Sequence, residues 1–310
     1  MAALQRAPQP TAQAVPAAHG ARTAALVAIA MLAFAANSLL CRQALRHTAI
    51  DPASFTAIRL LAGAVVLGLL GLRAPGFEPR AGYARFAPRA GSVRAALYLF
   101  TYAAAFSYAY ASLPAATGAL LLFAAVQLSM VGVGWWHGER PRARQAAGLL
   151  LAGAGLVALL LPGMAAPPPA GGALMILAGV AWGLYSLRGR TGGDPVAATA
   201  GNFQRAALMV LPLLIARALI EPGGTRVDAA GLVCALASGA LASGLGYAVW
   251  YRVLPALNAP LAAAVQLSVP VLTALGGWAL LGETPTIRLV LAAAAILGGI
   301  AIVARPPHPA

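Results

Sequence analysis

Two glutamines occupy equivalent positions in a sequence that repeats itself. Gln127 and Gln266 each lie within an identical AVQLS segment, and each segment follows a Leu-Pro pair. A glutamine side chain offers two hydrogen-bond donors and an acceptor, which suits an amide, a carboxylate or an amine. Both glutamines lie roughly 18–20 Å along apolar runs, near the middle of a membrane. We predict that they bind a substrate; the alternative is a hydrogen bond between helices, which is common in membranes.

Two arginines lie well inside apolar runs. They are Arg59 and Arg205, and the other charged residues fall at the ends of runs or between them. A charged side chain within the bilayer is costly and marks a functional site by default, so either arginine is predicted to meet an anionic group of a substrate. The alternatives are an arginine bonded to backbone carbonyls, or one whose long side chain reaches the membrane interface.

Aromatic residues and one asparagine form a third set. The aromatic members are Tyr102, Tyr110, Trp182, Tyr185, Tyr247, Trp250 and Tyr251. Because Tyr and Trp gather at membrane–water interfaces, most of them are expected to be interface anchors. Trp182 and Tyr247 lie deeper in their runs. Together with Asn37, which lies late in the first run, they are predicted to line a substrate cavity.

The sequence carries no pattern typical of catalysis. All seven carboxylates fall at the ends of apolar runs or in loops, and the four histidines lie outside the runs without metal-ligand spacing. No phosphate-binding glycine loop, nucleophile elbow or HExxH motif occurs. Cys41 and Cys234 lie inside apolar runs and are interpreted as packing residues. We therefore predict no enzyme activity, no catalytic residue, no metal and no cofactor.

The composition is that of an integral membrane protein. Of the 310 residues, 61% are hydrophobic and only 9% are charged, whereas soluble domains carry charge on about a quarter of their residues. Most of the surface is therefore expected to face the lipid bilayer. The net charge of +14 comes from arginines at the ends of apolar runs rather than in a patch, so nucleic acid is not an expected partner.

Ten apolar runs are long enough to cross a membrane as helices, each of which needs about 20 residues. Helices are predicted because lipid cannot satisfy unpaired backbone groups, and runs of this length exclude the alternating strands of a barrel. Small residues recur at helical spacing, as in Gly148 and Ala152 or Ala295 and Gly299, and permit close helix contact. The ten runs are 22–41, 53–72, 93–111, 114–136, 143–161, 171–187, 196–219, 229–251, 256–281 and 286–304.

An internal repeat divides the chain into two halves. Beyond the shared AVQLS segment, Gly138-Glu139 and Gly282-Glu283 each come shortly before a proline and another apolar run. Ten runs give five helices in each half, and because five is odd, the two halves must cross the membrane in opposite directions. Inverted-topology repeats of this kind are typical of secondary transporters. We predict an all-α membrane protein built from two such repeats.

Arginine placement predicts the orientation of the two repeats. With a cytoplasmic amino terminus, fourteen arginines fall in inside segments and five in outside segments, the asymmetry expected of cytoplasmic loops. The predicted parts are a disordered cytoplasmic segment over 1–20 and five-helix repeats over 21–162 and 170–304, with both termini cytoplasmic. Abundant alanine and the absence of lysine suggest a bacterium with a GC-rich genome, so we predict its cytoplasmic (inner) membrane.

Six segments carry a recognisable combination of motifs. They are the Asn37-Ser38 pair, FTAIRLLAGA in the second run, AWGLYSLRGR at the end of the sixth, SGLGYAVWYRVLPAL between the eighth and ninth, and the two Gly-Glu pairs. Together they resemble the EamA-type, ten-helix members of the drug/metabolite transporter superfamily over residues 21–303. One departure is Ala35-Ala36, where the family usually has Trp-Gly. The resemblance implies export or exchange of small metabolites, amino acids or drugs without ATP hydrolysis.

We therefore predict a secondary transporter that exports or exchanges a small amino-acid-like or drug-like molecule by alternating access. One alternative is a membrane-embedded enzyme acting on lipid, but it needs an acid, base or metal cluster that converges at one interface. Another is a channel, which needs a continuous polar pore that the scarcity of polar residues disfavours. The substrate, the coupling ion and the oligomeric state stay open at this stage.

Overall fold

Helices account for every regular element in the part of the chain that the structure describes. The structure is a computed structural model, and it describes residues 17–72, 90–136, 138, 143–161, 166–188, 195–220, 226–257 and 265–304. Its helices are α1 (Ala17–His47), α2 (Pro52–Leu72), α3 (Val93–Tyr110), α4 (Ala115–Trp136), α5 (Ala143–Leu160), α6 (Pro169–Arg188), α7 (Pro195–Met209), α8 (Leu211–Ile220), α9 (Ala229–Ala237), the π-helix η1 (Ser238–Leu245), α10 (Gly246–Val253), the 3₁₀ turn η2 (Leu254–Ala256), α12 (Ser268–Leu281) and α13 (Ile287–Ala304).

The described helices have the length and the surface of membrane-spanning segments. Seven helical segments are long and apolar enough to cross a bilayer. Large apolar side chains such as Leu150, Leu219 and Ile287 lie exposed on the outside of the bundle. Soluble proteins rarely expose apolar surface on this scale. The all-helical membrane-protein class predicted from composition is therefore confirmed.

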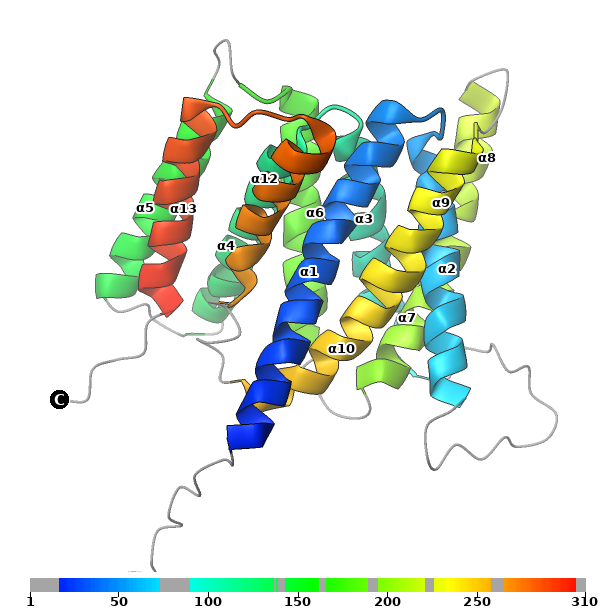
Figure 1. Cartoon of the computed structure of the whole chain (residues 1–310), viewed down its shortest axis with the longest axis horizontal. Coiled ribbons are helices and arrows are strands. Elements are labelled where there is room, and N and C mark those ends of the chain that lie inside the picture. Colours follow the sequence, from blue (N-terminus) through cyan, green and yellow to red (C-terminus); the bar gives the residue numbers. More distant parts are fainter. Residues whose placement is uncertain are drawn as a thin grey trace, which may run out of the picture.

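The helices pack side by side into one bundle, with α5 and α13 at one edge and α2, α7 and α9 toward the other (Figure 1). Small residues let α5 and α13 approach closely. A Cβ atom added to Gly148 would lie 2.6 Å from the Gly299 carbonyl oxygen, and one added to Gly155 would lie 2.9 Å from the Ala295 Cβ. The small residues predicted to permit helix contact do so between these two helices.

The inner contacts of the bundle join helices from the two halves of the chain. The helix α6 packs against α3 and α4, while α1 packs against α9, α10 and α12. The helix α2 packs against α7, α9 and η1. Because these contacts link segments far apart in the sequence, the core lies between the two halves rather than within either one.

The seventh and eighth predicted helices are interrupted. The seventh run is divided into α7 and α8 at Val210, shortly before Pro212. Proline removes a backbone donor, and its ring clashes with the carbonyl four residues earlier, which accounts for the break. The eighth run contains the π-helix η1 between α9 and α10. Periodicity alone does not reveal such a turn.

The first and ninth helices differ from the prediction in their limits. The helix α1 extends beyond the predicted run 22–41 at both ends and includes the last residues of the segment expected to be disordered, while residues 1–16 lie outside the described part. In the ninth run, residues 258–264 lie outside the described part, Val265 and Gln266 are helical, and a turn at Leu267 precedes α12, which begins at Ser268.

The described chain begins and ends on the same side of the bundle. The helix α1 begins and α13 ends at the end drawn lowest in Figure 1, which we call the lower end. The connections from α1 to α2 and from α12 to α13 lie at the opposite end, which we call the upper end. This arrangement places the Gly-Glu pair that follows α12 at the upper end.

Candidate functional site

Arg59 lies fully inside the bundle. It belongs to α2 and is 1% exposed. Its Nη2 donates a hydrogen bond to the Tyr102 hydroxyl at 3.0 Å, and its Nε donates to the Ser243 Oγ at 3.3 Å. Its Cζ lies 5.1 Å from the centroid of the Tyr102 ring and 4.9 Å from that of Phe106. The arginine is therefore held by α3 and η1, and it does not reach the surface of the bundle.

Asn37 extends this set of polar contacts to α1. Its Nδ2 donates to the Tyr102 hydroxyl at 3.2 Å, and its Oδ1 accepts a hydrogen bond of 2.7 Å from the Ser238 Oγ. The Tyr102 hydroxyl thus accepts from both Asn37 and Arg59. Buried polar groups that are paired in this way fix one another's positions.

Aromatic rings surround the polar contacts. The Trp182 ring of α6 lies 4.9 Å from the Tyr102 ring and 4.9 Å from the Tyr247 ring, measured between centroids. The Phe34 ring of α1 lies 5.7 Å from Tyr247, edge to face. Such offset and edge-to-face contacts are favourable beyond the burial of area.

These residues form one buried group at the contact between the two halves, which we call the Arg59 cluster. It comprises Phe34, Asn37, Arg59, Tyr102, Phe106, Trp182, Ser238, Ser243 and Tyr247. Four of its members, Asn37, Arg59, Trp182 and Tyr247, are among the seven residues predicted to bind substrate. The structure brings these four together and leaves the other three outside.

The π-helix η1 brings two serines to the same cluster. Ser238 bonds Asn37 and Ser243 bonds Arg59, although they are five residues apart. In an α-helix residues five apart point about 140° away from each other, whereas the π-helix joins such residues with a hydrogen bond. Gly239 lets η1 approach α2, since a Cβ atom there would lie 2.8 Å from the Arg59 Cα.

The positive charge of Arg59 has no carboxylate partner among the described residues. The two ion pairs found there are Arg42 with Glu283 and Arg217 with Asp51. The Nη1 of Arg59 is buried and has no hydrogen-bond partner in the described part of the chain. Among the described residues, the charge is therefore met by neutral hydroxyls and by the faces of two rings.

Arg205 has different surroundings. Its Nη1 donates to the backbone carbonyls of Ala90 at 2.6 Å and Gly201 at 3.2 Å. These bonds tie α7 to the residues just before α3, which is the arrangement expected of an arginine bonded to backbone carbonyls. A role of Arg205 in substrate binding stays a prediction.

The two glutamines also lie apart from the Arg59 cluster. Gln127 is half-buried in α4, and Gln266 is half-buried two residues before α12. The helices α4 and α12 pack against each other, as the repeat leads one to expect of equivalent helices. That both glutamines face a shared substrate cavity stays a prediction.

The expectation that most of the aromatic residues are interface anchors is wrong. All seven are buried inside the bundle, and the outward-facing aromatics include Trp135, Trp136 and Trp278, of which Trp136 is 90% exposed. Sequence reasoning therefore missed the place of Tyr102 in the site. The available signal was the spacing of Tyr102 and Phe106, since residues four apart share one face of a helix.

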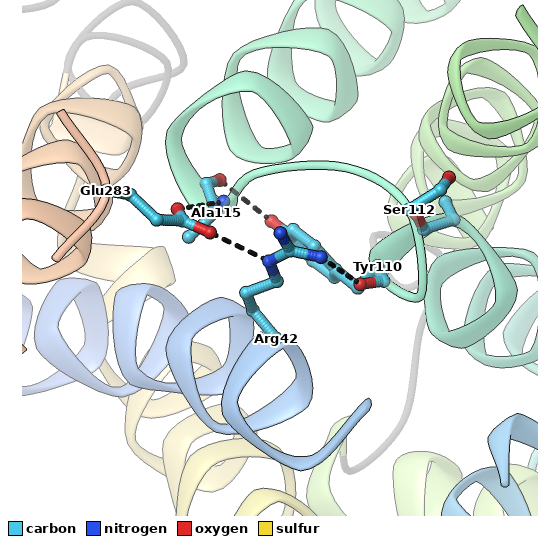
Figure 2. A network of polar contacts seen from close by, with 6 residues as sticks. Arg42, Tyr110, Ser112, Ala115 and Glu283 are labelled. Carbon is cyan, nitrogen blue, oxygen red and sulfur yellow. Dashed lines mark hydrogen bonds and ion pairs between the residues drawn. The ribbon is translucent and has the colours of Figure 1, made fainter. Parts of the chain in front are cut away.

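A second polar network joins α1, the first turn of α4 and the segment after α12 (Figure 2). The Arg42 Nε donates to Glu283 Oε1 at 2.7 Å, and the Arg42 Nη1 donates to the Tyr110 carbonyl at 3.1 Å. The backbone N–H of Ala115 donates to Glu283 Oε2 at 2.6 Å. Glu283 thus caps the first turn of α4, where a negative charge is favourable, and joins it to α1. We call Arg42, Tyr110, Ala115 and Glu283 the upper clamp.

A cavity of about 310 Å³ lies beside the upper clamp. Its lining includes Thr117 of α4, Gly277 of α12, Glu283, Thr286 and Leu289. None of the seven predicted substrate-binding residues lines it. This cavity is therefore a feature of the upper end and is separate from the Arg59 cluster.

Comparison with known proteins gives consistent matches along the chain. The sequence profile of the EamA-like transporter family matches residues 21–161 and 169–305. An uncharacterized protein of Pseudomonas aeruginosa is 56% identical over 286 residues, which cover 92% of this chain and 95% of that protein. A solved crystal structure shares the fold with a TM-score of 0.61 and 23% sequence identity, over 91% of this chain and 97% of the solved chain.

Proposed function

This chain belongs to the EamA-like transporter family, and we propose that it is a secondary transporter that moves a small molecule by alternating access. The predicted resemblance to the drug/metabolite transporter superfamily is confirmed by the family match. Export or exchange of a metabolite, without ATP hydrolysis, is the activity we propose.

One observation carries the proposal. The Arg59 cluster is a buried group of polar and aromatic side chains at the contact between the two halves of the chain. Substrates of secondary transporters bind near the midplane between repeats. A charged residue within the bilayer is expensive and is retained chiefly where it serves a substrate pathway. We therefore propose the Arg59 cluster as the substrate site, with Asn37, Arg59, Trp182 and Tyr247 as binding residues.

The helix packing supports ten spans arranged as two inverted repeats, over residues 21–162 and 170–304. When α7 with α8 counts as one span, and α9, η1 and α10 as another, each half contributes five. The helix α5 packs on α13, α2 on α7 and α4 on α12, and in each of these pairs a helix meets its equivalent in the other half. A two-fold axis in the membrane plane accounts for such pairing.

The proposed orientation has the lower end in the cytoplasm of a bacterial inner membrane. Both ends of the described chain lie at the lower end (Figure 1), and the arginine asymmetry favours a cytoplasmic location for both termini. The Pseudomonas aeruginosa relative is consistent with a bacterial membrane.

Gln127, Gln266 and Arg205 are proposed to act outside the Arg59 cluster. The helices that carry the two glutamines pack against each other, so a substrate that moves between the halves can meet them along its path. Arg205 lies in the second half of α7 and is bonded to the Ala90 carbonyl just before α3, and there it can meet an anion before or after the central site.

Counterflow in liposomes tests the proposal against its two rivals. The purified protein is reconstituted and supplied with labelled amino acids, organic acids and organic amines in turn. A carrier shows saturable uptake of at least one probe that is accelerated when the same unlabelled compound is inside. Uptake that rises linearly and shows no acceleration indicates a channel, and chemical conversion of added phospholipid indicates an enzyme.

A further inference from the structure

We infer that the transported molecule is an organic carboxylate with an apolar body, and that its carboxylate binds at the Nη1 of Arg59. The inference rests on the proposed transport function and names the substrate class of the same site. It narrows the amino-acid-like or drug-like substrates expected from the sequence to singly charged anions.

Arg59 has a donor that the rest of the described chain does not use. Its Nε and Nη2 are hydrogen-bonded, but its buried Nη1 is not. A buried donor without a partner is unfavourable, and a buried charge without a counter-ion is more so. The planar guanidinium matches the two oxygens of a carboxylate. A bound carboxylate would therefore supply both the missing hydrogen bond and the missing charge.

The neighbours of Arg59 position its guanidinium without neutralising it. The Tyr102 hydroxyl accepts from Arg59 and from Asn37, and Asn37 in turn accepts from Ser238. All of these partners are uncharged. The direction of Nη1 is thus set before a ligand arrives, and pre-organisation of this kind lowers the cost of binding.

Neither structural explanation for an intramembrane arginine fits Arg59. It is 1% exposed, so its side chain does not extend along the outside of the bundle as that of an arginine reaching for the interface would. Its hydrogen bonds go to the hydroxyls of Tyr102 and Ser243, whereas Arg205 donates to the backbone carbonyls of Ala90 and Gly201. Of the two intramembrane arginines, Arg59 is therefore the one whose charge a bound anion would neutralise.

The charge of the cluster sets the charge of the substrate. Arg59 is the one charged member of the Arg59 cluster, and nearby Arg42 is already paired with Glu283. A single positive charge favours a monoanion over a dicarboxylate or a phosphate monoester. The cluster also contains no carboxylate that would pair with an ammonium group, which disfavours zwitterionic amino acids.

The rings of the cluster define the rest of the substrate. Phe34, Trp182 and Tyr247 are buried against one another beside Tyr102. Flat apolar surfaces of this kind suit an aromatic or branched hydrocarbon body. Because Arg59 is 1% exposed, the substrate reaches it when the helices of the two halves move apart, as alternating access requires.

Ligand-induced thermal stabilisation of the purified full-length protein tests the inference, because a ligand that binds the folded state raises Tm. The probes are benzoate, 3-phenylpropanoate, indole-3-acetate and 4-methylpentanoate, each beside its own primary amide, with 3-phenylpropylamine as the cation. We expect at least one acid to bind on the order of tenfold or more tightly than its amide, since hydrogen bonds between charged groups are the strong ones.

Three variants test whether the acid binds at Arg59. Arg59→Gln should abolish stabilisation by the acid, and Arg59→Lys, which retains the charge but not the planar fork, should weaken it. Arg252→Gln is the matched control, since Arg252 is exposed in the last turn of α10 and should leave acid binding unchanged. Size-exclusion chromatography checks that each variant is folded. If Arg59→Gln fails that check, unchanged acid binding by Arg59→Lys overturns the inference.

Any of three further results overturns the inference. They are that no acid raises Tm, that each acid and its amide raise Tm equally, or that the acid still raises the Tm of folded Arg59→Gln. Counterflow with the same probes separates this inference from the proposed function. Acid binding without counterflow contradicts transport but not the anion site. Counterflow of an amide or of the amine, without acid binding, contradicts the carboxylate but not transport.

Discussion

The Tyr102 hydroxyl is the point at which the polar contacts of the Arg59 cluster converge. It accepts hydrogen bonds from Asn37 on α1 and from Arg59 on α2, while the ring of the same residue packs against Trp182 on α6. A tyrosine can serve both roles because its ring is apolar and its hydroxyl is polar. Three helices are therefore positioned through one side chain.

Tyr102→Phe should lower stability while preserving the packing of the ring. The change leaves two buried donors, on Asn37 and Arg59, without their acceptor, which costs about 1–3 kcal/mol. Thermal unfolding in detergent measures the loss, with Tyr108→Phe, a half-buried tyrosine of the same helix, as the control. Equal Tm values for the two variants would show that the hydroxyl does not hold the cluster together.

Sequence reasoning recognises some members of the cluster and not others for physical reasons. Arg59 is conspicuous because a charge in an apolar run is costly wherever it points. Tyr102 is not, since a tyrosine suits both a membrane interface and a buried network. Ser238 and Ser243 would lie on different faces of an α-helix. The π-helix η1 turns both of them toward α1 and α2, and its position cannot be read from periodicity.

The helix α2 is fixed at its first turn by Asp51. The Asp51 carboxylate accepts hydrogen bonds from the amides of Ala53 and Ser54 at 3.0 Å and from the Ser54 hydroxyl at 2.7 Å. It also accepts from the Arg226 amide at 2.9 Å, just before α9. This residue therefore caps α2 and ties it to the segment before α9, the helix that continues into η1. Asp51 thus fixes the relative position of α2 and η1, which both contribute to the Arg59 cluster.

Stability should depend on the ionisation of Asp51. Burial raises the pKa of its carboxyl, but hydrogen bonds from Ser54 and Arg226 lower it more, so the pKa lies below its ordinary value near 3.9. Since the folded pKa is the lower one, the carboxylate stabilises the fold above about pH 4, and this contribution is lost as the pH falls through the folded pKa. Asp51→Asn keeps a capping oxygen but removes the negative charge at the amino end of α2, and should cost about 0.3–1 kcal/mol at neutral pH.

The measurement is Tm as a function of pH for the parent protein and for Asp51→Asn. We expect the two curves to be separate at pH 6 and to converge in acid, because the parent loses its carboxylate there and the variant has none to lose. Curves that stay parallel down to pH 3 would contradict the capping role.

The contact between α2 and η1 depends on the absence of a side chain at Gly239. A Cβ atom there would lie 2.8 Å from the Arg59 Cα and still closer to its carbonyl oxygen. Gly239→Ala should therefore push the two elements apart and cost about 1–3 kcal/mol. Gly153→Ala in α5 is the control, because nothing lies within 4 Å of its added Cβ and alanine is the better helix former. If both variants unfold at the parent's Tm, the close approach is unimportant.

The helices themselves were largely predictable, and their interruptions were not. Apolar length fixes where a helix crosses the membrane, so the ends of α2, α4 and α5 lie within a residue or two of the predicted runs. The break at Val210 follows from Pro212, whose effect can be read in the sequence but competes with the apolar continuity around it. The π-turn has no comparable sequence signal.

The bundle as a whole has its two described chain ends on one side (Figure 1). An even number of membrane crossings places both termini in the same compartment, and the fourteen-to-five arginine split favours the cytoplasm. Reporter fusions at the two termini, one active only in the cytoplasm and one only in the periplasm, should both report the cytoplasm. A periplasmic carboxy terminus would contradict ten spans.

Alternating access at the Arg59 cluster is tested most directly by the accessibility of one position from the two sides of the membrane. Ser243→Cys is made in a protein whose Cys41 and Cys234 are replaced by alanine, and it is labelled with a membrane-impermeant thiol reagent in right-side-out and inside-out vesicles. The Glu283→Gln change loosens the upper clamp by removing the charge that pairs with Arg42. We predict that this change raises the labelling rate from the outside and lowers it from the inside, since a carrier opens to one side at a time. Rates that rise together from both sides, or a cysteine that reacts from neither side, would contradict transport through this cluster.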